Sequence, residues 1–477
     1  MNRNASQLLD AQLKRLFGRI NYERQNTPKA SDFKLANMLE LVGRLCDPHL
    51  KYPVIHVAGT KGKGSVCTYL GAILAASGLK TGVYTSPHLE VVHQRIAIDG
   101  QIIGDQQLLE VLNRMAPVID EMDGRAVDSG VSKLTFFEVI TAAAMLHFAN
   151  ERVDVAVLEV GMGGRLDSTN ICKPELCVIT NVSLDHTQQL GETVDRIARE
   201  KAGIIKSGIP VVSGATHPEV LPVISETAQR HSANLFSMDQ DFYCDSQVVG
   251  RQDSEWSSTS HQARVSNRFR VRGKVGQESY QIDELEVGIW GAHQQQNASM
   301  AIAAVHVLIE NGWSISQQHI RAGLRQARLE GRTEVLMRQP TVVVDMAHNV
   351  ASAAALADTL CLEIPEFSEA NRRRLVFAAS REKDVEGMLR PLAAVFDEIC
   401  LTQFTSNPRG MPVQQLTEIA AQVPNSTNTQ WLTKPDSRTA GLWCLENMEE
   451  RDFTCITGSV FLVAELRPLM LQIANDR

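Results

Sequence analysis

The sequence predicts an α/β protein built on parallel sheets, and three observations lead to this fold class. Short apolar runs of strand length alternate with segments of helical spacing through most of the 477 residues. A glycine-rich stretch, "GTKGKGS" at residues 59–65, joins one apolar run to a helical segment. After residue 330 the alternation begins again. Because one core rarely supports so long a chain, we expect two domains, residues 1–330 and 331–477.

The individual elements follow from the same patterns. Apolar runs predict first-domain strands at 53–58, 81–85, 154–160, 176–180 and 210–214, and second-domain strands at 341–346, 374–380, 398–404 and 453–459. Helical spacing predicts helices at 134–150, 193–206 and 293–311. Residues 244–285 are polar and rich in Ser, Gln and Arg, which indicates hairpins or a loose insertion.

Composition excludes several classes of function. The net charge is -8, with 47 basic against 55 acidic residues, whereas nucleic-acid-binding proteins are normally basic. The nine cysteines are scattered and form neither a redox pair nor a zinc motif, which is typical of reduced thiols in a cytoplasmic enzyme. The N-terminal segment lacks the apolar core of a signal peptide, and no apolar run is long enough to span a membrane.

The glycine-rich stretch predicts a phosphate-binding loop. It lies between a strand and a helix, so unpaired N–H groups at the helix N-terminus face whatever the loop holds. The common pattern G-x-x-x-x-G-K-[ST] would need Gly at position 57 and a hydroxyl at 64, but Val57 and Gly64 occupy these places and Ser65 follows. Lys63 would reach the outer phosphates. The alternative is a glycine turn that binds no ligand.

Three polar residues follow the ends of three predicted strands: Ser86, Glu159 and His186. Because the carboxyl ends of parallel strands share one edge, we expect these side chains to meet near the glycine loop. A hydroxyl, a carboxylate and an imidazole beside a triphosphate would suit Mg²⁺.

Each of these three residues also has a purely structural alternative. Ser86 could cap a helix before Pro87, Glu159 could pair with Arg165, and His186 could be a core histidine bonded to Asp185.

The ordered motifs resemble the folylpolyglutamate synthase family, often bifunctional as dihydrofolate synthase, within the Mur ligase superfamily. The resemblance covers roughly residues 10–470 and is carried in order by "GTKGKGS", "TSPHL", "TFFE", "EVGMGGRLDSTN", "DHTQQLG", "EKAGIIK", "HQQQNA", "GRTE", "DMAHN" and "TGSVFLVAELR". It implies an N-terminal P-loop-type parallel-sheet ATPase domain and a smaller C-terminal Rossmann-like α/β domain. Two positions depart from the usual family pattern: Lys61, where many members have Asn, and Met346, where Gly or Val is usual.

The resemblance also implies a reaction. ATP phosphorylates a carboxylate to an acyl phosphate, the amine of L-glutamate attacks, and phosphate leaves, with Mg²⁺ neutralising charge. The expected acceptors are dihydropteroate and reduced folates. The expected enzyme is a cytoplasmic monomer with no nucleic-acid or membrane partner.

Residue roles are carried over by position. ATP contacts match the glycine loop and three later residues: Gly59, Thr60, Lys61, Gly62, Lys63, Gly64, Ser65, Asn297, Arg332 and Asp345. Metal ligands match Ser86, Glu159 and His186. Lys201 matches a lysine that is carbamylated in relatives, a change that would turn a cation into a ligand. An unmodified lysine that is salt-bridged near the phosphates is the alternative.

The residues expected to serve catalysis are Lys63, His186, Lys201, Asp345 and His348. The resemblance implies that Asp345 holds the incoming amine or the nucleotide.

Bifunctional members contact dihydropteroate at the positions of Thr135, Phe136, Phe137 and Asp167. One phenylalanine could stack on the pterin, and Asp167 could pair with its aminopyrimidine edge. The alternative is a core aromatic pair and an aspartate that caps a turn.

Several other functions stay open at this point. A Mur-type ligase would add an amino acid to a cell-wall precursor, although "TFFE" and "GGRLD" argue against it. A folylpolyglutamate synthase without dihydrofolate synthase activity would keep every motif of the ATP site. A nucleotide-dependent switch would need the loop but not a second domain with "DMAHN". An inactive paralogue would be expected to have lost some of the matched polar residues.

Overall fold

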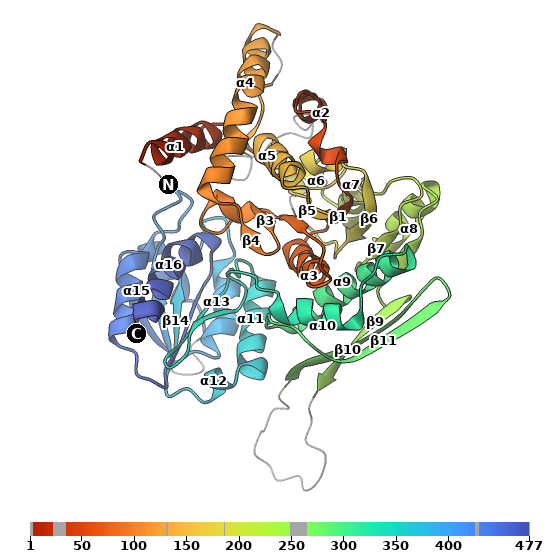
Figure 1. The fold of residues 1–477 in the computed structure, drawn as a ribbon. Coiled ribbons are helices and arrows are strands. Elements are labelled where there is room, and N and C mark those ends of the chain that lie inside the picture. Colours follow the sequence, from red (N-terminus) through yellow and green to blue (C-terminus); the bar gives the residue numbers. More distant parts are fainter. Residues whose placement is uncertain are drawn as a thin grey trace. The chain divides into compact units, whose positions relative to one another are not determined.

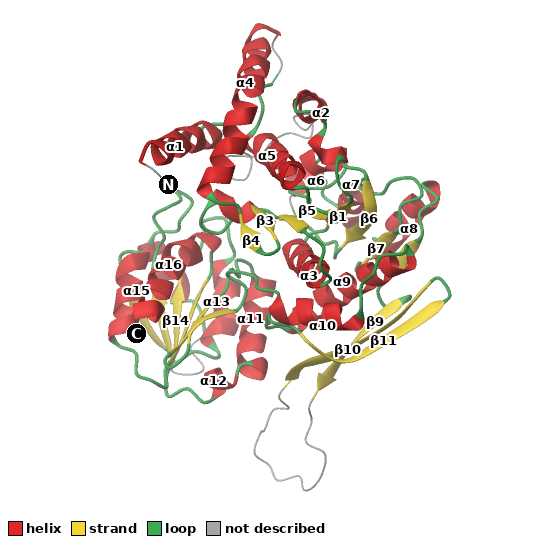
Figure 2. Ribbon diagram, in the orientation of Figure 1, coloured by secondary structure: helices red, strands yellow, loops and turns green. Residues whose placement is uncertain are grey.

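The computed structural model describes residues 3–21, 35–129, 132–185, 187–248, 265–424 and 429–476. The chain forms two compact units, each of which packs helices against a sheet (Figures 1 and 2). The first unit is drawn from Met1–Asp245, Arg270–Glu286 and Gln296–Ala327, and the second from Ser246–Phe269, Val287–Gln295 and Arg328–Arg477. The expected domain boundary near residue 330 stays a prediction.

The first unit is organised around one large sheet. Its strands are β1 Val54–Ala58, β2 Thr81–Tyr84, β3 Ile96–Ile98, β4 Gln101–Ile102, β5 Val155–Glu159, β6 Pro174–Ile179, β7 Val211–Ser213 and β8 Leu235–Ser237. They lie in the order β4-β3-β2-β5-β1-β6-β7-β8. From β2 to β8 the pairs are parallel, whereas β3 and β4 add an antiparallel edge. β1 lies between β5 and β6 and is buried along its length, which explains its continuous apolar run.

Helices cover both faces of this sheet. They are α1 Arg3–Phe17, α2 Leu35–Arg44, α3 Lys63–Ala76, α4 Asp105–Ser129, α5 Phe136–Glu151, α6 Thr187–Leu190, α7 Val194–Ala202, α8 Leu221–Arg230 and α10 Gln317–Gln326, together with most of α9 Ala292–Glu310. Gly71 of α3 lies against Val83, whereas Phe148 of α5 lies against Gly82 on the opposite face of β2. α5 is apolar on every side because it packs between the sheet and the helices α2 and α4.

The polar segment after residue 241 forms a second, small sheet. Its strands are β9 Phe242–Val248, β10 Val265–Val275 and β11 Glu278–Glu286, in the order β11-β10-β9. Along β10, Phe269 and Val271 are buried while Arg270 and Arg272 bond carboxylates of neighbouring strands. The expected hairpin is therefore found at 265–286, and residues 249–264 of the predicted insertion lie outside the described residues.

The second unit has its own sheet and core. Its strands are β12 Glu334–Met337, β13 Thr341–Val344, β14 Arg373–Phe377, β15 Glu398–Leu401, β16 Gln430–Thr433 and β17 Phe453–Thr457, and its helices are α11 Val350–Glu363, α12 Pro365–Ser368, α13 Val385–Ala393, α14 Val413–Ala420, α15 Ser437–Glu446 and α16 Val460–Asp476. The strand order is β12-β13-β17-β14-β15-β16, and only β12 is antiparallel to its neighbour within the described ranges.

The predicted elements are found, with bounds that differ by up to four residues from the predicted ones. The helix expected at 193–206 stops at Ala202, because the N–H groups of the next residues bond carbonyls three positions back, as in Ile204 to Lys201 at 3.3 Å, and no longer follow the α-helical pattern. The strand expected at 341–346 stops at Val344, because the next residue, Asp345, turns its carboxylate back onto the chain.

Candidate active site

The glycine loop joins the central strand β1 to the N-terminus of α3. Gly62 caps the helix with a φ of 86°, and Gly59 has a φ of 149°. A Cβ on Gly59 would lie 1.8 Å from Thr180 Oγ1, so only glycine fits there. Within the loop 59–62, Thr60 and Lys61 have side chains and the two glycines have none. The loop leads directly into the first N–H groups of α3.

The segment that follows β6 holds this loop in place. Asn181 accepts hydrogen bonds from the N–H of Thr60 through its carbonyl (2.8 Å) and from the N–H of Lys61 through its side chain (2.8 Å). Thr180 donates its hydroxyl to the Lys61 carbonyl at 2.7 Å, and Thr60 and Ser183 exchange hydrogen bonds at 3.1 and 3.2 Å. Sequence reasoning missed Thr180, Asn181 and Ser183. Their position directly after the strand next to β1 was the available signal.

Ser86 and Glu159 meet beside the loop, as expected from their strand ends. Glu159 is 3% exposed, and its Oε2 accepts the Ser86 N–H at 3.0 Å. The same Oε2 lies 3.5 Å from where a Cβ of Gly64 would be, which places the carboxylate against the first turn of α3. Ser86 lies in a bend rather than at a helix N-cap, and Arg165 bonds Glu200 at 3.0 Å. The third expected member, His186, lies outside the described residues.

Lys201 joins the same group from α7. Its side chain is buried, and Nζ donates to the Gly59 carbonyl at 2.7 Å. Burial first, and then the charge of Lys63, lowers the pKa of Lys201 to about 7, while Asp185 and Asp167 act in the opposite direction. Lys63 itself donates from Nζ to the Thr60 carbonyl at 3.3 Å. The amine of Lys201 is thus held against the glycine loop in a form that titrates near neutral pH.

Asn297 approaches the loop from α9. Its side chain is buried, and its Oδ1 lies 2.4 Å from where a Cβ of Gly62 would be. The amide therefore lies against the residue that caps α3.

The expected pterin contacts lie at the start of α5 and in the loop after β5. Thr135 caps α5 by accepting the Glu138 N–H. Phe136 is fully buried: Phe17 stacks on it with ring centroids 5.7 Å apart, and the Arg95 guanidinium lies 5.1 Å from its ring centre. Phe137 is only half-buried and packs on Gly161. Of the two rings, Phe137 is the one with a partly open surface.

Asp167 is bound into its own loop. Its Oδ1 accepts the Thr169 N–H (3.0 Å) and hydroxyl (2.6 Å), and its Oδ2 accepts the Met162 N–H (2.9 Å). Burial raises the pKa of Asp167, and these hydrogen bonds act in the opposite direction. The carboxylate caps the turn Ser168–Ile171, as in the structural alternative, and leaves 6% of the residue exposed.

The second unit holds the remaining predicted residues near the end of β13. Asp345 follows this strand and accepts the N–H (2.7 Å) and hydroxyl (3.1 Å) of Thr333 through Oδ2 and the Ala347 N–H (2.8 Å) through Oδ1. His348 Nδ1 bonds the Met346 carbonyl at 2.9 Å. Arg332 precedes Thr333, so the structure brings Arg332, Asp345 and His348 to one edge of this sheet.

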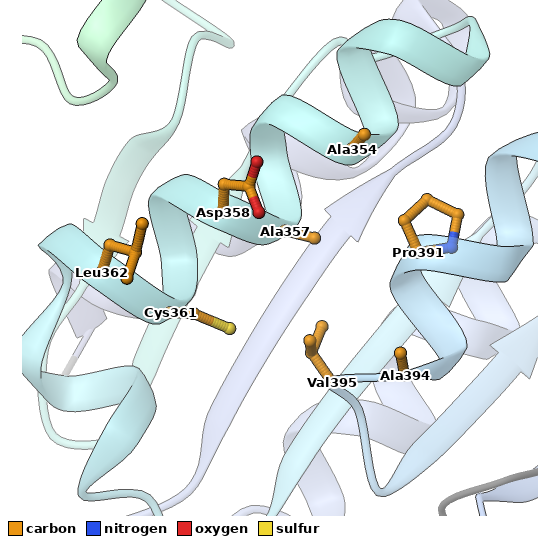
Figure 3. Close-up of a pocket in the computed structure, with 8 residues that line it drawn as sticks. All are labelled: Ala354, Ala357, Asp358, Cys361, Leu362, Pro391, Ala394 and Val395. Carbon is orange, nitrogen blue, oxygen red and sulfur yellow. The ribbon is translucent and has the colours of Figure 1, made fainter. Parts of the chain in front are cut away.

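A separate pocket of about 400 Å³ lies between α11 and α13 (Figure 3). Asp358 and Cys361 of α11 face Pro391 and Val395 across it. Its lining comes from these two helices and the turn after α13, so it does not contain the predicted residues of the β13 edge.

Among the described residues, Ser86 and Glu159 near the glycine loop provide some, but not all, of the ligands that a hard divalent cation needs. A buried carboxylate lies next to a serine, and the bare Gly64 leaves the approach open. No cluster of three or more His, Cys, Asp or Glu side chains is placed to hold a metal among the described residues. The fit of Ser86 and Glu159 thus depends on oxygen ligands from phosphate and water.

Comparison with known families matches both parts of the chain. The Mur ligase middle domain matches residues 57–305, and the C-terminal domain of dihydrofolate synthetase matches residues 329–471. The dihydrofolate synthase/folylpolyglutamate synthase of Bacillus subtilis (strain 168) is 33% identical over 435 residues, which are 91% of this chain and 94% of that protein. The chain belongs to the dihydrofolate synthase/folylpolyglutamate synthase family.

Solved structures of this family have the same fold. Escherichia coli FolC in complex with DHPP and ADP is 27% identical, covers 98% of each chain and has a TM-score of 0.76. The bifunctional folylpolyglutamate synthase/dihydrofolate synthase of Yersinia pestis, complexed with AMPPNP and Mn ion, is 29% identical, covers 97% of this chain and 98% of its own, and has a TM-score of 0.75. The predicted α/β fold class is therefore confirmed.

Membership of the dihydrofolate synthase/folylpolyglutamate synthase family also decides the class of reaction. The chain is an ATP-dependent ligase that joins glutamate to a folate-type acceptor, and the cell-wall alternative is not favoured. Among the described residues, we find no helix with the length and apolar character needed to cross a bilayer.

Proposed function

We propose that this enzyme is bifunctional and adds L-glutamate to both dihydropteroate and reduced folates. The observation that carries the ATP-dependent part of the proposal is the buried Glu159 carboxylate, which accepts the Ser86 N–H and lies against the first turn of α3 beside the glycine loop. The relatives that combine both activities in their names, in Bacillus subtilis and Yersinia pestis, support the dual assignment.

In the proposed reaction the glycine loop binds the triphosphate. Its N–H groups and the positive end of the α3 dipole face the phosphates, and Lys63 reaches the outer ones. The acceptor carboxylate takes the γ-phosphoryl group, ADP leaves, and the glutamate amine displaces phosphate from the acyl phosphate. Ser86, Glu159 and His186 would hold Mg²⁺, which supplies neutralisation of the phosphate charge when bound. The Mn ion in the Yersinia pestis structure supports a divalent cation.

Lys201 is proposed to carry a carbamate. Only a neutral amine adds CO₂, and a pKa of about 7 leaves a large neutral fraction at physiological pH. The unmodified alternative is a cationic amine bonded to the Gly59 carbonyl. ¹³C NMR of the full-length enzyme with ¹³C-bicarbonate should give a carbamate signal that Lys201→Arg lacks. A spectrum without this signal in the parent enzyme would favour the unmodified amine.

The second unit is proposed to supply the remaining contacts. Arg332 would bind phosphate, Asp345 would hold the glutamate amine or the nucleotide, and His348 would face the reacting groups. Their shared position at the end of β13 supports these roles, because ligands gather at the carboxyl ends of parallel strands. Asn297, against the capping residue Gly62, is proposed as a further nucleotide contact.

For the pterin, we propose Phe137 as the stacking ring and Thr135 as its neighbour. The partly exposed side chain of Phe137 supports this choice over the fully buried Phe136. Asp167 would act mainly by fixing the loop 161–167, since its carboxylate oxygens already accept backbone hydrogen bonds.

One assay tests the proposed function. ADP release should be measured with dihydropteroate and with tetrahydrofolate as acceptors, each with and without L-glutamate. Bifunctionality predicts turnover with both acceptors that depends on L-glutamate. Turnover with tetrahydrofolate alone would leave a folylpolyglutamate synthase without dihydrofolate synthase activity, and turnover with neither would contradict the assignment.

A further inference from the structure

Two residues to which the proposed reaction gives no role, Glu334 and Arg467, meet in the second unit. Glu334 ends "GRTE" at the start of β12, and Arg467 ends "TGSVFLVAELR" in α16. The Arg467 guanidinium bonds the Glu334 carboxylate twice, Nε to Oε2 and Nη2 to Oε1, both at 2.8 Å. Its Nη2 also lies 3.2 Å from Glu330 Oε1. With its side chain 9% exposed, Arg467 is among the few buried arginines of the chain.

Glu334 in turn holds the tight turn that carries Arg332. Its Oε2 accepts the Gly331 N–H at 2.7 Å, so the same oxygen that Arg467 binds also closes the turn. On the other side of Arg332, Thr333 donates its N–H to Asp345 at 2.7 Å. Both neighbours of Arg332 are thus fixed through carboxylates.

This turn needs to be held, because its backbone conformation is unfavourable. Gly331 has a φ of 67°, which glycine adopts freely, but Thr333 has a φ of 41°. A β-branched residue in this left-handed region is an outlier that persists only when its surroundings enforce it. A fork-shaped guanidinium that grips both oxygens of Glu334 fixes the carboxylate in direction as well as in place.

We propose that Arg467 is a positioning residue that aims Arg332 at the nucleotide by holding Glu334. This inference rests on the proposed function, in which Arg332 binds phosphate. It assigns a role to Arg467 of α16, a helix that contributes no predicted contact of its own. An ordinary surface ion pair would instead have little effect on binding.

A double-mutant cycle tests the proposal with ADP as the probe. Arg332→Met, Arg467→Met and the double variant of the full-length enzyme are compared by calorimetry of ADP binding. Each single substitution should weaken ADP binding about tenfold, the size of one charge-assisted phosphate contact. Because Arg467 acts through Arg332, the double variant should bind no more than about threefold weaker than Arg332→Met alone.

Arg373→Met is the matched control. Arg373 also grips a carboxylate, with Nη2–Oδ1 and Nε–Oδ2 distances to Asp397 of 2.8 and 3.1 Å, but it lies at the start of β14, opposite the edge that bears Asp345. This variant should bind ADP like the parent. If Arg467→Met folds poorly, Glu334→Gln keeps the side-chain volume and one oxygen and should weaken ADP binding in the same way.

Hydrogen exchange tests directly whether Arg467 holds the turn that carries Arg332, independently of ADP binding. Peptides that cover 329–334 should exchange faster in Arg467→Met than in the parent, and unchanged exchange would overturn the proposal. Additive losses in the cycle, or unchanged ADP binding by Arg467→Met when Arg332→Met binds weakly, would also overturn it. If Arg332→Met itself binds ADP normally, the phosphate role of Arg332 is wrong and the positioning role falls with it, while the ligase assay still decides the proposed function.

Discussion

At the scale of single residues, Gly62 is a position of the glycine loop where a side chain would contact Asn297. Gly62 is the N-cap of α3 and Gly78 follows its C-cap, Ser77, with φ values of 86° and 90°. A Cβ would lie 2.4 Å from Asn297 Oδ1 at Gly62, but would have no atom within 4 Å at Gly78. Alanine at either position should cost about 1 kcal/mol of unfolding free energy, because the left-handed region strains it. Only Gly62→Ala should also weaken ADP binding, by tenfold or more, when both variants are titrated by calorimetry. Equal ADP affinities for the two variants would contradict the proposed contact.

Strand ends made part of the site predictable from sequence. Ser86 and Glu159 follow β2 and end β5, so the topology of a parallel sheet alone brings them together. Asn181 also follows a strand end, after β6, but its role could not be read from the sequence, because it accepts backbone N–H groups of the loop and such contacts leave no motif. Nor does the sequence reveal that both carboxylate oxygens of Asp167 accept hydrogen bonds from its own loop, since the neighbouring residues would be the same if the carboxylate were open to a ligand.

At the scale of elements, the first turn of α5 contains one phenylalanine that packs in the core and one that is proposed to bind the pterin. Phe136 is fully buried under Phe17 and Arg95, whereas Phe137 is half-buried. Phe136→Leu should therefore lower the unfolding free energy by about 1–3 kcal/mol in urea and leave the KM for dihydropteroate unchanged. Phe137→Leu should leave the unfolding free energy nearly unchanged and raise that KM about fivefold, which corresponds to the loss of one aromatic stacking contact. The same KM for both variants would remove Phe137 from the pterin site.

Buried strands were predictable from the sequence, whereas several edge strands and the long helix α4 were not predicted. The central strand β1 was evident because all of its side chains are covered. The edge strands β4 and β16 were missed, since β4 has two exposed residues and β16 has no fully buried ones. β10 was ambiguous because its outward arginines make the segment read as polar, although Phe269 and Val271 alternate with them.

At the scale of the whole molecule, one buried charge network connects distant segments, and no sequence motif reveals it. In the second unit Arg374 is 2% exposed and bonds both Glu398 and Asp452 at 2.7 Å, which ties β14 to β15 and to the turn before β17. Such a network requires residues from three distant segments. Fold class follows from alternation along the chain, whereas partners like these follow only from the folded arrangement.

In the first unit, His56 makes the stability of the fold depend on pH. It lies fully buried in the central strand, with Nε2 bonded to Thr169 Oγ1 at 2.8 Å and Nδ1 without a partner among the described residues. Burial, and to a smaller degree the charge of Lys206, lowers the pKa of His56 to about 3. The unfolded chain binds the proton near pH 6.5, so this contribution to stability is complete above that pH and is lost as pH falls toward 3.

The dependence of the unfolding free energy on pH below 7 therefore tests whether His56 is buried in its neutral form. Between pH 7 and 4.5, the titration of His56 should lower the unfolding free energy by about 2–3 kcal/mol. His56→Gln cannot titrate and keeps a group that can bond Thr169, so its loss over the same interval, measured by urea unfolding, should be smaller by that amount. His217→Gln, at an exposed position, should lose as much as the parent. If His56→Gln and the parent lose equal stability, His56 is not held neutral in the core, and the acid sensitivity must come from other groups.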